Sequence, residues 1–322
     1  MVLKWTVTAV LVVGAAEAGA GGQGISLRPE FVVGQVTEYL SRGTITHQAS
    51  TEDMPPSEPV RITTESGMQV KVARLRPEGG AEIEWTLRYV VIKTTEAVPG
   101  IPMKLDYDSR EPGSAQSPLA PMFAELVGRP ITIEVDASGR VLGSRNMPVG
   151  GPQGVLGDLL GGFFSPEMFE QLPLFITAGA PSPAKKNSKW NRALRIPLPL
   201  GAGSIDFNTI HKLSKVNRRE STALIAIEGD IAKGAVSGAT AQPAPDRTVV
   251  IHDGRFTGSA EWDTALGQLK SAESRMSLNL TLDTLLGRMN VQQEMISSVE
   301  RTKTSRPDQT KTPKNDSSEA RP

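Results

Sequence analysis

The sequence predicts a mainly β protein of the α+β class, in which a long antiparallel sheet packs around a few helices. Segments in which apolar and polar residues alternate recur throughout residues 25–299, and they outnumber the segments with helical spacing. The turns between these segments are short and contain Gly, and connections of that length join antiparallel neighbours. We therefore expect a single β-rich domain over 25–299.

Residues 1–20 are typical of a signal peptide. Lys4 gives a positive start, the apolar run over 5–16 is too short to cross a bilayer, and small residues at 16–20 offer a cleavage site. We expect an exported protein, periplasmic or extracellular, and the alternative of a short N-terminal anchor stays open. The chain has no Cys, which excludes disulfides and thiolate chemistry.

The strands can be placed in order along the chain. One hairpin over 67–95 turns at 77–80, and another over 131–142 turns at 137–139 and pairs Val135 with Val141. Further strands are expected at 35–48, 204–213, 222–231, 247–252 and 289–299. His252, Asp253 and Gly254 are interpreted as a turn. The turn at 137–139 is similar to one at 264–267, which suggests two related halves, about 25–150 and 185–299.

The stretch 256–282 forms a further hairpin whose register follows from its turn. A three-residue loop at 265–267, with Gly267 in the left-handed region, pairs Thr264 with Gln268. The pairs that follow are Trp262–Lys270, Ala260–Ala272 and Phe256–Met276.

This register predicts one apolar and one polar face. Met276, Leu278 and Leu280 lie on the apolar face, because side chains of a strand alternate with a period of two. Glu261 and Asp263 point to the other face, where solvated carboxylates beside a turn are favoured over acid–base catalysis.

Two segments have helical spacing, and one end of the chain is polar. The segment 117–128 stops at Gly128, and the segment 153–176 holds four of the eight Phe of the chain, Phe163, Phe164, Phe169 and Phe175. Residues 300–322 contain no large apolar side chain, so we expect a disordered tail there.

Neither composition nor motifs indicate nucleic acid, a metal or a cofactor. The chain carries 35 basic and 35 acidic side chains, and this zero net charge favours no nucleic-acid partner. His47, His211 and His252 lack metal-ligand spacing, and no phosphate-binding loop or nucleophile elbow occurs. We predict no catalytic residue and no cofactor, so an enzyme is the less favoured class. The enzymatic alternative is a hydrolase that brings together acids such as Asp106, Asp108 or Glu134.

Several motifs occur in the order found in a family of exported bacterial proteins of unknown function. An F-x-x-G-x-x-x-x-Y opening starts at Phe31, a V-G-x-x-h-x-x-x-V-x-x-x-G-x-V hairpin starts at Val127, and the closing hairpin keeps Asp263, Gly267 and Leu269. The sequence resembles this family over 27–285. It departs from it at Trp262, where the family has Phe, and at 188–189, where the family has Gly-Asp.

The resemblance implies a layout and no activity. The family is similar in layout to envelope lipid carriers, in which an unclosed antiparallel barrel surrounds helices, so we expect a long curved sheet or incomplete barrel.

The favoured function is a non-catalytic exported envelope protein that binds an apolar or lipid-like ligand in the concave face of its sheet. The apolar residues expected to contact the ligand are Phe163, Phe164, Phe169, Phe175, Trp262, Met276 and Leu278. The expected partner is an apolar small molecule or an envelope protein, with no nucleic acid and at most peripheral membrane association. A structural or protein-interaction module of the envelope is the alternative.

Overall fold

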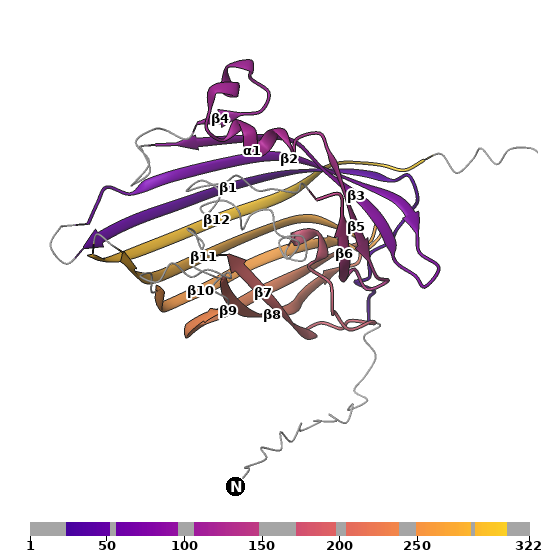
Figure 1. The fold of residues 1–322 in the computed structure, drawn as a ribbon. Helices are drawn as coiled ribbons and strands as arrows, with labels where there is room; N and C mark the ends of the chain where they lie inside the picture. The colour runs from indigo at the N-terminus through magenta and orange to yellow at the C-terminus, as the bar shows by residue number, and fades with distance from the viewer. Residues whose placement is uncertain are drawn as a thin grey trace, which may run out of the picture.

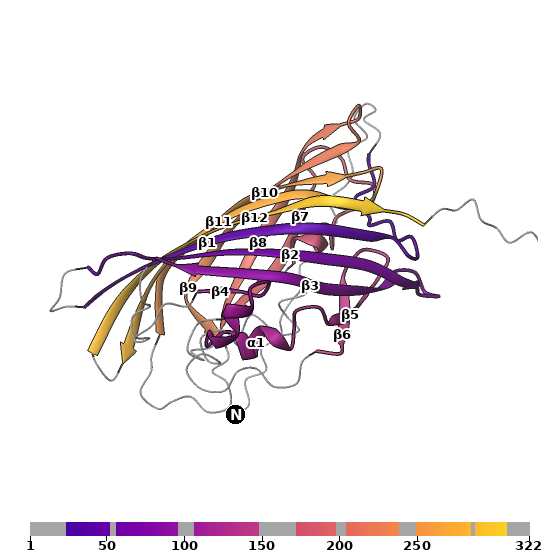
Figure 2. The ribbon, with the colours of Figure 1, turned by 90° about the horizontal axis from the view of Figure 1, so that it is seen from above.

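The computed structural model shows a single open sheet of 12 antiparallel strands, which confirms the predicted fold class (Figures 1 and 2). The structure describes residues 24–51, 56–95, 106–147, 172–197, 204–237, 249–284 and 287–307. The predicted signal peptide, most of the helical segment 153–176, with Phe163, Phe164 and Phe169, and residues 308–322 lie outside these ranges.

The strands follow the order β6-β5-β3-β2-β1-β12-β11-β10-β9-β8-β7, and β4 pairs with β3. Strands of both predicted halves share this sheet, because β1 pairs along its full length with β12 at the centre of the sheet. The first six strands are β1 (Val36–Thr51), β2 (Val60–Leu75), β3 (Ala81–Thr94), β4 (Tyr107–Asp108), β5 (Pro130–Val135) and β6 (Val141–Arg145). The others are β7 (Lys189–Pro197), β8 (Ser204–Asn217), β9 (Thr222–Ser237), β10 (Val249–Asp263), β11 (Gln268–Thr284) and β12 (Gly287–Ser305).

Helical structure in the described part of the chain is short. The expected helix at 117–128 is only α1 (Ala120–Ala124), preceded by the 3-10 helix η1 (Pro112–Gln116), and a second 3-10 helix, η3, covers Pro173–Phe175. Gly128 ends the α1 region with a φ of 80°, where Gly has no steric cost. The apolar spacing of 117–128 therefore reflects packing of Met122 and Phe123 against the sheet and not a long helix.

The hairpin of β10 and β11 has the predicted register except next to its turn. Ala260 pairs with Ala272 and Phe256 with Met276, as expected. The turn is longer than predicted, because Asp263 already pairs with Gln268 and Trp262 with Leu269. A bulge between Glu261 and Trp262 restores the register further along the strands.

Two other expectations are wrong. The strand β12 continues to Ser305, so the predicted tail does not begin at 300. Residues 300–305 have no large apolar side chain, but their backbone pairs with β1, and this pairing is sufficient to place them in the sheet. His252 and Gly254 lie inside β10 and not in a turn. The break in alternation there is a bulge between Ile251 and Asp253.

The sheet curves so strongly that strands far apart in its order share one core. Trp85 of β3 and Ile225 of β9 belong to the same cluster, with Phe123 of α1 and Phe175 of η3 between the two sides. We call this the first cluster. α1 and η3 lie on the concave side of the sheet (Figure 2), so the first cluster fills only the part of the concavity that these short elements reach.

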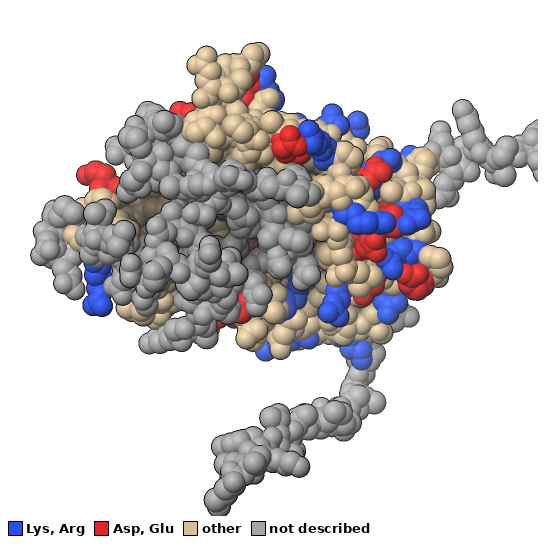
Figure 3. Space-filling view, in the orientation of Figure 1, with Lys and Arg blue, Asp and Glu red and all other residues tan. Residues whose placement is uncertain are grey.

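Ion pairs secure the edge of the sheet at β5 and β6. Glu82 contacts Arg74 and Arg145, and Glu134 contacts Arg76 and Arg145, so charges of both signs interleave at this end of the molecule (Figure 3). The Arg74 and Arg145 side chains are more than half exposed, which limits each pair to a small contribution to stability. The charged edge disfavours pairing with another sheet.

Candidate ligand-binding face

The long strands place alternate residues on the concave face, and paired residues of neighbouring strands form levels that cross the sheet. We name four levels by their residue on β8. From β8 to β2, the Leu213 level continues with Ile225, Ala260, Ala272, Val299, Ser41 and Ser66. The His211 level continues with Ile227, Gly258, Ser274, Ser297, Gly43 and Thr64. The Thr209 level continues with Gly229, Phe256, Met276, Met295, Ile45 and Ile62. The Phe207 level continues with Ile231, Gly254, Leu278, Gln293, His47 and Val60.

The side chains of these four levels on β8, β9, β10, β11, β12, β1 and β2 include no charged group at neutral pH. The only titratable ones are His211 and His47. Burial lowers the pKa of both, and the charge of Arg192 lowers the pKa of His211 further, to about 3. The alternate residues of the same strands point to the convex face and include Lys212, Glu228, Asp230, Arg255, Glu273, Arg275, Glu294, Arg42 and Glu65. Charge is thus confined to the convex side of this region.

Beyond the first cluster, the concave face carries a second group of buried apolar side chains. This second cluster consists of Ile205, Phe207, Ile231, Ile251, Met276, Leu278 and Leu280. The partly buried side chains packed against it are Leu194, Val249, Phe256, Val291 and Met295. All of these residues lie on six neighbouring strands of the sheet, β7, β8, β9, β10, β11 and β12. Within the described ranges, therefore, the second cluster is a single layer of the sheet, whereas a stable sheet face is covered by a second layer.

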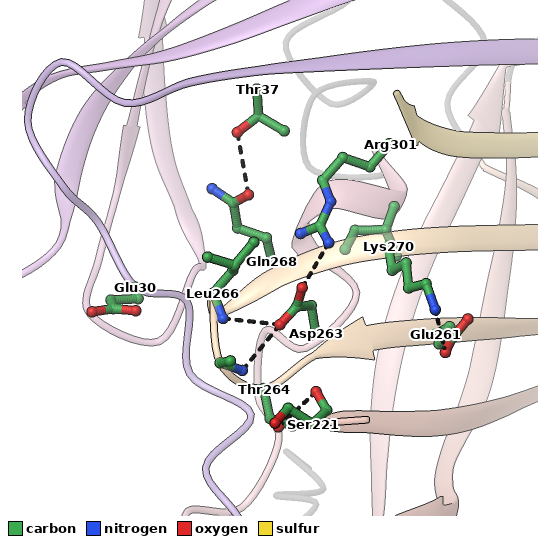
Figure 4. Close-up of polar contacts among 12 residues, drawn as sticks. Glu30, Thr37, Ser221, Glu261, Asp263, Thr264, Leu266, Gln268, Lys270 and Arg301 are labelled. Carbon is green, nitrogen blue, oxygen red and sulfur yellow. Dashed lines mark hydrogen bonds and ion pairs between the residues drawn. The ribbon is translucent and has the colours of Figure 1, made fainter. Parts of the chain in front are cut away.

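The turn of the β10–β11 hairpin lies at the other end of the concave face, and its acid is not free (Figure 4). Asp263 Oδ1 accepts the backbone N–H groups of Ala265 and Leu266, each at 3.0 Å, and Oδ2 accepts Arg301 Nη2 at 2.6 Å. Burial acts to raise the pKa of Asp263, but Arg301 and the two N–H groups outweigh it, so the pKa is lowered. Glu261, by contrast, forms an exposed pair with Lys270 at 3.0 Å. Asp263 is a structural residue of the turn, and the expectation that it is merely solvated is wrong.

A small cavity of about 50 Å³ lies beside this turn. Its lining includes Thr37, Tyr39, Phe175, Trp262 and Gln268. A volume of this size has room for a few water molecules but not for an acyl chain. The part of the concavity that holds the first cluster is therefore a packed core.

One buried polar pair lies on the concave face between the two clusters. Thr209 and His211, 0% and 3% exposed, are on β8 between Phe207 of the second cluster and Leu213 of the first. The Thr209 hydroxyl donates to the carbonyl oxygen of Arg192 at 3.2 Å, so it can only accept from His211 Nε2, 3.0 Å away. Nε2 therefore carries the ring hydrogen, and Nδ1 is an acceptor. Nδ1 is buried and has no hydrogen-bond partner among the described residues.

The two Thr–His pairs found among the described residues do not activate a nucleophile. A catalytic His must accept the hydroxyl hydrogen, but Thr209 donates its hydrogen to a backbone carbonyl. On the convex face, Thr281 lies 2.6 Å from His252 Nε2 and donates its hydrogen to Asn290 Oδ1 at 2.8 Å. In both pairs the hydroxyl accepts from His, which is the reverse of what hydrolysis requires.

Of the acids named for a hydrolase, Asp106 and Asp108 lie near one end of β3 and Glu134 near the other. Asp106 accepts hydrogen bonds from the backbone N–H and the hydroxyl of Thr94. Asp108 pairs with Val91 of β3 and binds Arg110, whereas Glu134 pairs with Glu82 of β3 and binds Arg145. Positions 82 and 91 of one strand are about 30 Å apart at the usual rise. In the part of the chain that the structure describes, no group of three or more His, Asp or Glu could hold a metal ion.

The structure divides the predicted ligand-contacting residues between two places. Phe175 and Trp262, 6% and 1% exposed, belong to the first cluster and line the small cavity. Met276 and Leu278, each 2% exposed, belong to the second cluster. The polar pair Thr209 and His211 on β8 was not predicted from the sequence. The alternation over 205–213 puts Thr209 and His211 on the same face as Ile205, Phe207 and Leu213. Two polar residues at apolar positions of a strand are the sequence signal that indicates this pair.

Comparison with known proteins gives little guidance about function. No protein-family model and no curated protein matches the chain. Among solved structures, one described as "Lipid-protein interactions in lipovitellin" is similar over 86% of this chain at 13% identity, with a TM-score of 0.49. The chain spans only 26% of the length of that protein.

Two further solved structures are less similar. DynF from the dynemicin biosynthesis pathway of Micromonospora chersina has a TM-score of 0.21 at 7% identity, over 91% of this chain and 92% of that one. The attachment invasion locus protein Ail of Yersinia pestis has a TM-score of 0.14 at 6% identity, over 84% and 99%. Scores this low carry no argument about function. Within the described ranges, no helix combines the length and the apolar character needed to span a bilayer.

Proposed function

We propose that this chain is a non-catalytic exported envelope protein that holds an apolar, lipid-like ligand against the concave face of its sheet. The observation that carries the proposal is the charge-free region of four levels on seven strands, with the second cluster at one end of it. The ligand contacts in this proposal are Met276 and Leu278, together with Phe207 and Ile231 beside them.

The physical reason is the cost of charge and the gain from apolar contact. A hydrocarbon chain gains about 25 cal/mol for each Å² of apolar surface removed from water, but it gains nothing from a surface that carries hydrated charges. Within these four levels the charged groups of the seven strands lie on the convex side, so this part of the concave side is the one suited to hydrocarbon. The reversed Thr–His hydrogen bonds and the scattered acids support a binding protein over a hydrolase.

The test compares two neighbouring positions on opposite faces of β11. Delipidated protein is titrated with pyrene-labelled dodecane, and its binding is followed by fluorescence. We expect Leu278→Gln to weaken binding at least tenfold, because it loses a buried apolar contact and adds an amide that must be desolvated. Ser277→Gln, exposed on the convex face, should leave binding unchanged. Absence of uptake by the unsubstituted protein would refute the proposal.

A protein-interaction module is the second candidate, and it is supported by the open sheet. β6 and β7 are the two ends of the strand order, so each has one edge without a neighbouring strand within the described ranges. An edge of this kind can accept an added strand from a partner, and because ion pairs disfavour this at β6, β7 is the acceptor edge in this candidate. Stoichiometric capture of an envelope protein that competes with a β7-derived peptide, without any uptake of the hydrocarbon, would favour this candidate over the carrier.

A further inference from the structure

The concave face changes character at the His211 level. On the four central strands this level carries Gly258, Ser274, Ser297 and Gly43, so none of its side chains there is larger than Ser. The next level toward the second cluster carries Phe256, Met276, Met295 and Ile45 on the same strands. A row of small and hydroxyl-bearing residues thus runs beside a row of bulky apolar ones. We call the His211 level the polar level.

A second observation, independent of side-chain size, comes from the same level. His211 is 97% buried, and its Nδ1 is an acceptor with no partner among the described residues. An unpaired buried acceptor is costly, typically about 1–3 kcal/mol, and native proteins rarely keep one without reason. The ring is held in place from two sides. Thr209 accepts its Nε2–H, and the Trp190 ring lies 5.5 Å away, fixed by a hydrogen bond from Nε1 to the carbonyl of Ile176.

We propose that the polar level receives the uncharged, hydroxyl-bearing end of the ligand, with His211 Nδ1 accepting the hydroxyl hydrogen and the hydrocarbon part lying over the second cluster. The ligand is then a long-chain alcohol, a sterol or an acylglycerol. This inference rests on the proposed function and specifies the substrate class for the same face.

The chemistry of the level favours a neutral group over a carboxylate. A carboxylate has no hydrogen to donate to Nδ1, and its lone pairs would face those of the ring nitrogen. Ser274 and Ser297 bind each other at 2.7 Å, and no cationic side chain occurs on the level from β8 to β2. Arg192 of β7 pairs with Thr209 and is a cation that could attract an anion. Tighter binding of an acid is therefore one outcome of the test.

The experiment uses the full delipidated chain and three probes with the same label and chain length, namely pyrene-labelled dodecane, dodecanol and dodecanoic acid. At pH 7.5 we expect the alcohol to bind about tenfold more tightly than the hydrocarbon and the acid, the equivalent of one hydrogen bond to a buried acceptor. His211→Phe, which keeps an aromatic ring and removes both nitrogens, should reduce this preference to within about twofold and preserve hydrocarbon binding.

A second pair of variants guards against failure of His211→Phe to fold. Ser274→Ala removes a hydroxyl of the polar level and should reduce the preference for the alcohol about threefold, whereas Ser277→Ala on the convex face should not change it. Equal binding of all three probes, tighter binding of the acid, or an alcohol preference that survives both His211→Phe and Ser274→Ala would overturn this inference and leave the carrier proposal standing. Failure of every probe to bind would overturn both.

Discussion

Replacement of Asp263 by Asn should destabilise the protein far more than its position beside a hairpin turn suggests. The Asp263 and Arg301 side chains are only 15% and 13% exposed, and one carboxylate serves both the turn and the guanidinium. Asn has a single oxygen. It can accept either from the N–H groups of Ala265 and Leu266 or from Arg301, and its amide hydrogens then oppose the other donors.

The magnitude follows from the degree of burial. Exposed ion pairs contribute about 0–1 kcal/mol, whereas breaking a fully buried pair costs about 3–5 kcal/mol. For this nearly buried pair we expect a loss of about 2 kcal/mol in the free energy of unfolding. A domain of this size should then melt about 4–8 °C lower.

The assay is urea unfolding followed by far-ultraviolet circular dichroism, with Glu261→Gln as the matched control. Glu261 forms an exposed pair with Lys270, so this control should change stability by less than about 0.5 kcal/mol. Introducing Arg301→Met into the wild type and into Asp263→Asn completes a double-mutant cycle, which gives the coupling energy of the Asp263–Arg301 pair. Equal effects of Asp263→Asn and Glu261→Gln, or a coupling energy near zero, would show that Asp263 is an ordinary surface acid.

Two other predictions concern pH and the turn. His211 has a folded-state pKa of about 3 against 6.5 unfolded, so the unfolded chain takes up the proton first and stability falls as the pH drops from 6.5. Wild-type protein should lose about 2 kcal/mol more than His211→Gln between pH 7 and pH 5 in parallel urea titrations, and parallel curves would contradict a buried neutral His211. Gly267→Ala should cost more than about 2 kcal/mol, because φ is 60° and a Cβ would lie 2.3 Å from the backbone nitrogen of Glu30. Gly179→Ala, with a φ of 81° and open space around it, should cost about 1 kcal/mol, so equal melting temperatures of the two variants would exclude the close approach.

Local patterns in the sequence were sufficient to predict the hairpins, but not the pairing of strands that are far apart in the chain. Alternation and turn chemistry predicted the hairpins 67–95, 131–142 and 256–282, and the pairs Val135–Val141 and Ala260–Ala272 are present. The bulge beside Trp262 was not predicted, although it interrupts the alternation: the buried residues Leu269 and Ala272 of β11 are three positions apart and not two. The pairing of β1 with β12 joins the two ends of the domain, and no local signal indicates it.

The candidate site shows the same limit. Met276 and Leu278 could be predicted as part of an apolar face from their alternation. That Phe175 and Trp262 belong to a packed core instead depends on how the sheet curves around η3, which is a tertiary property. The burial and ion pairing of Asp263 likewise depend on Arg301 of β12. Arg301 belongs to the stretch from 300 onward, which its composition alone predicts to be a disordered tail.

The most direct test of ligand binding is native mass spectrometry of the protein purified from its own host, before and after extraction with organic solvent. We expect a mass excess of a few hundred daltons that the solvent removes, with a neutral, hydroxyl-bearing lipid in the extract. Re-addition of that lipid should restore the excess in the wild type and in Ser277→Gln, but not in Leu278→Gln. A bare polypeptide mass before extraction, together with no uptake of the lipid or of the pyrene probes afterwards, would contradict the claim that the concave face binds a ligand.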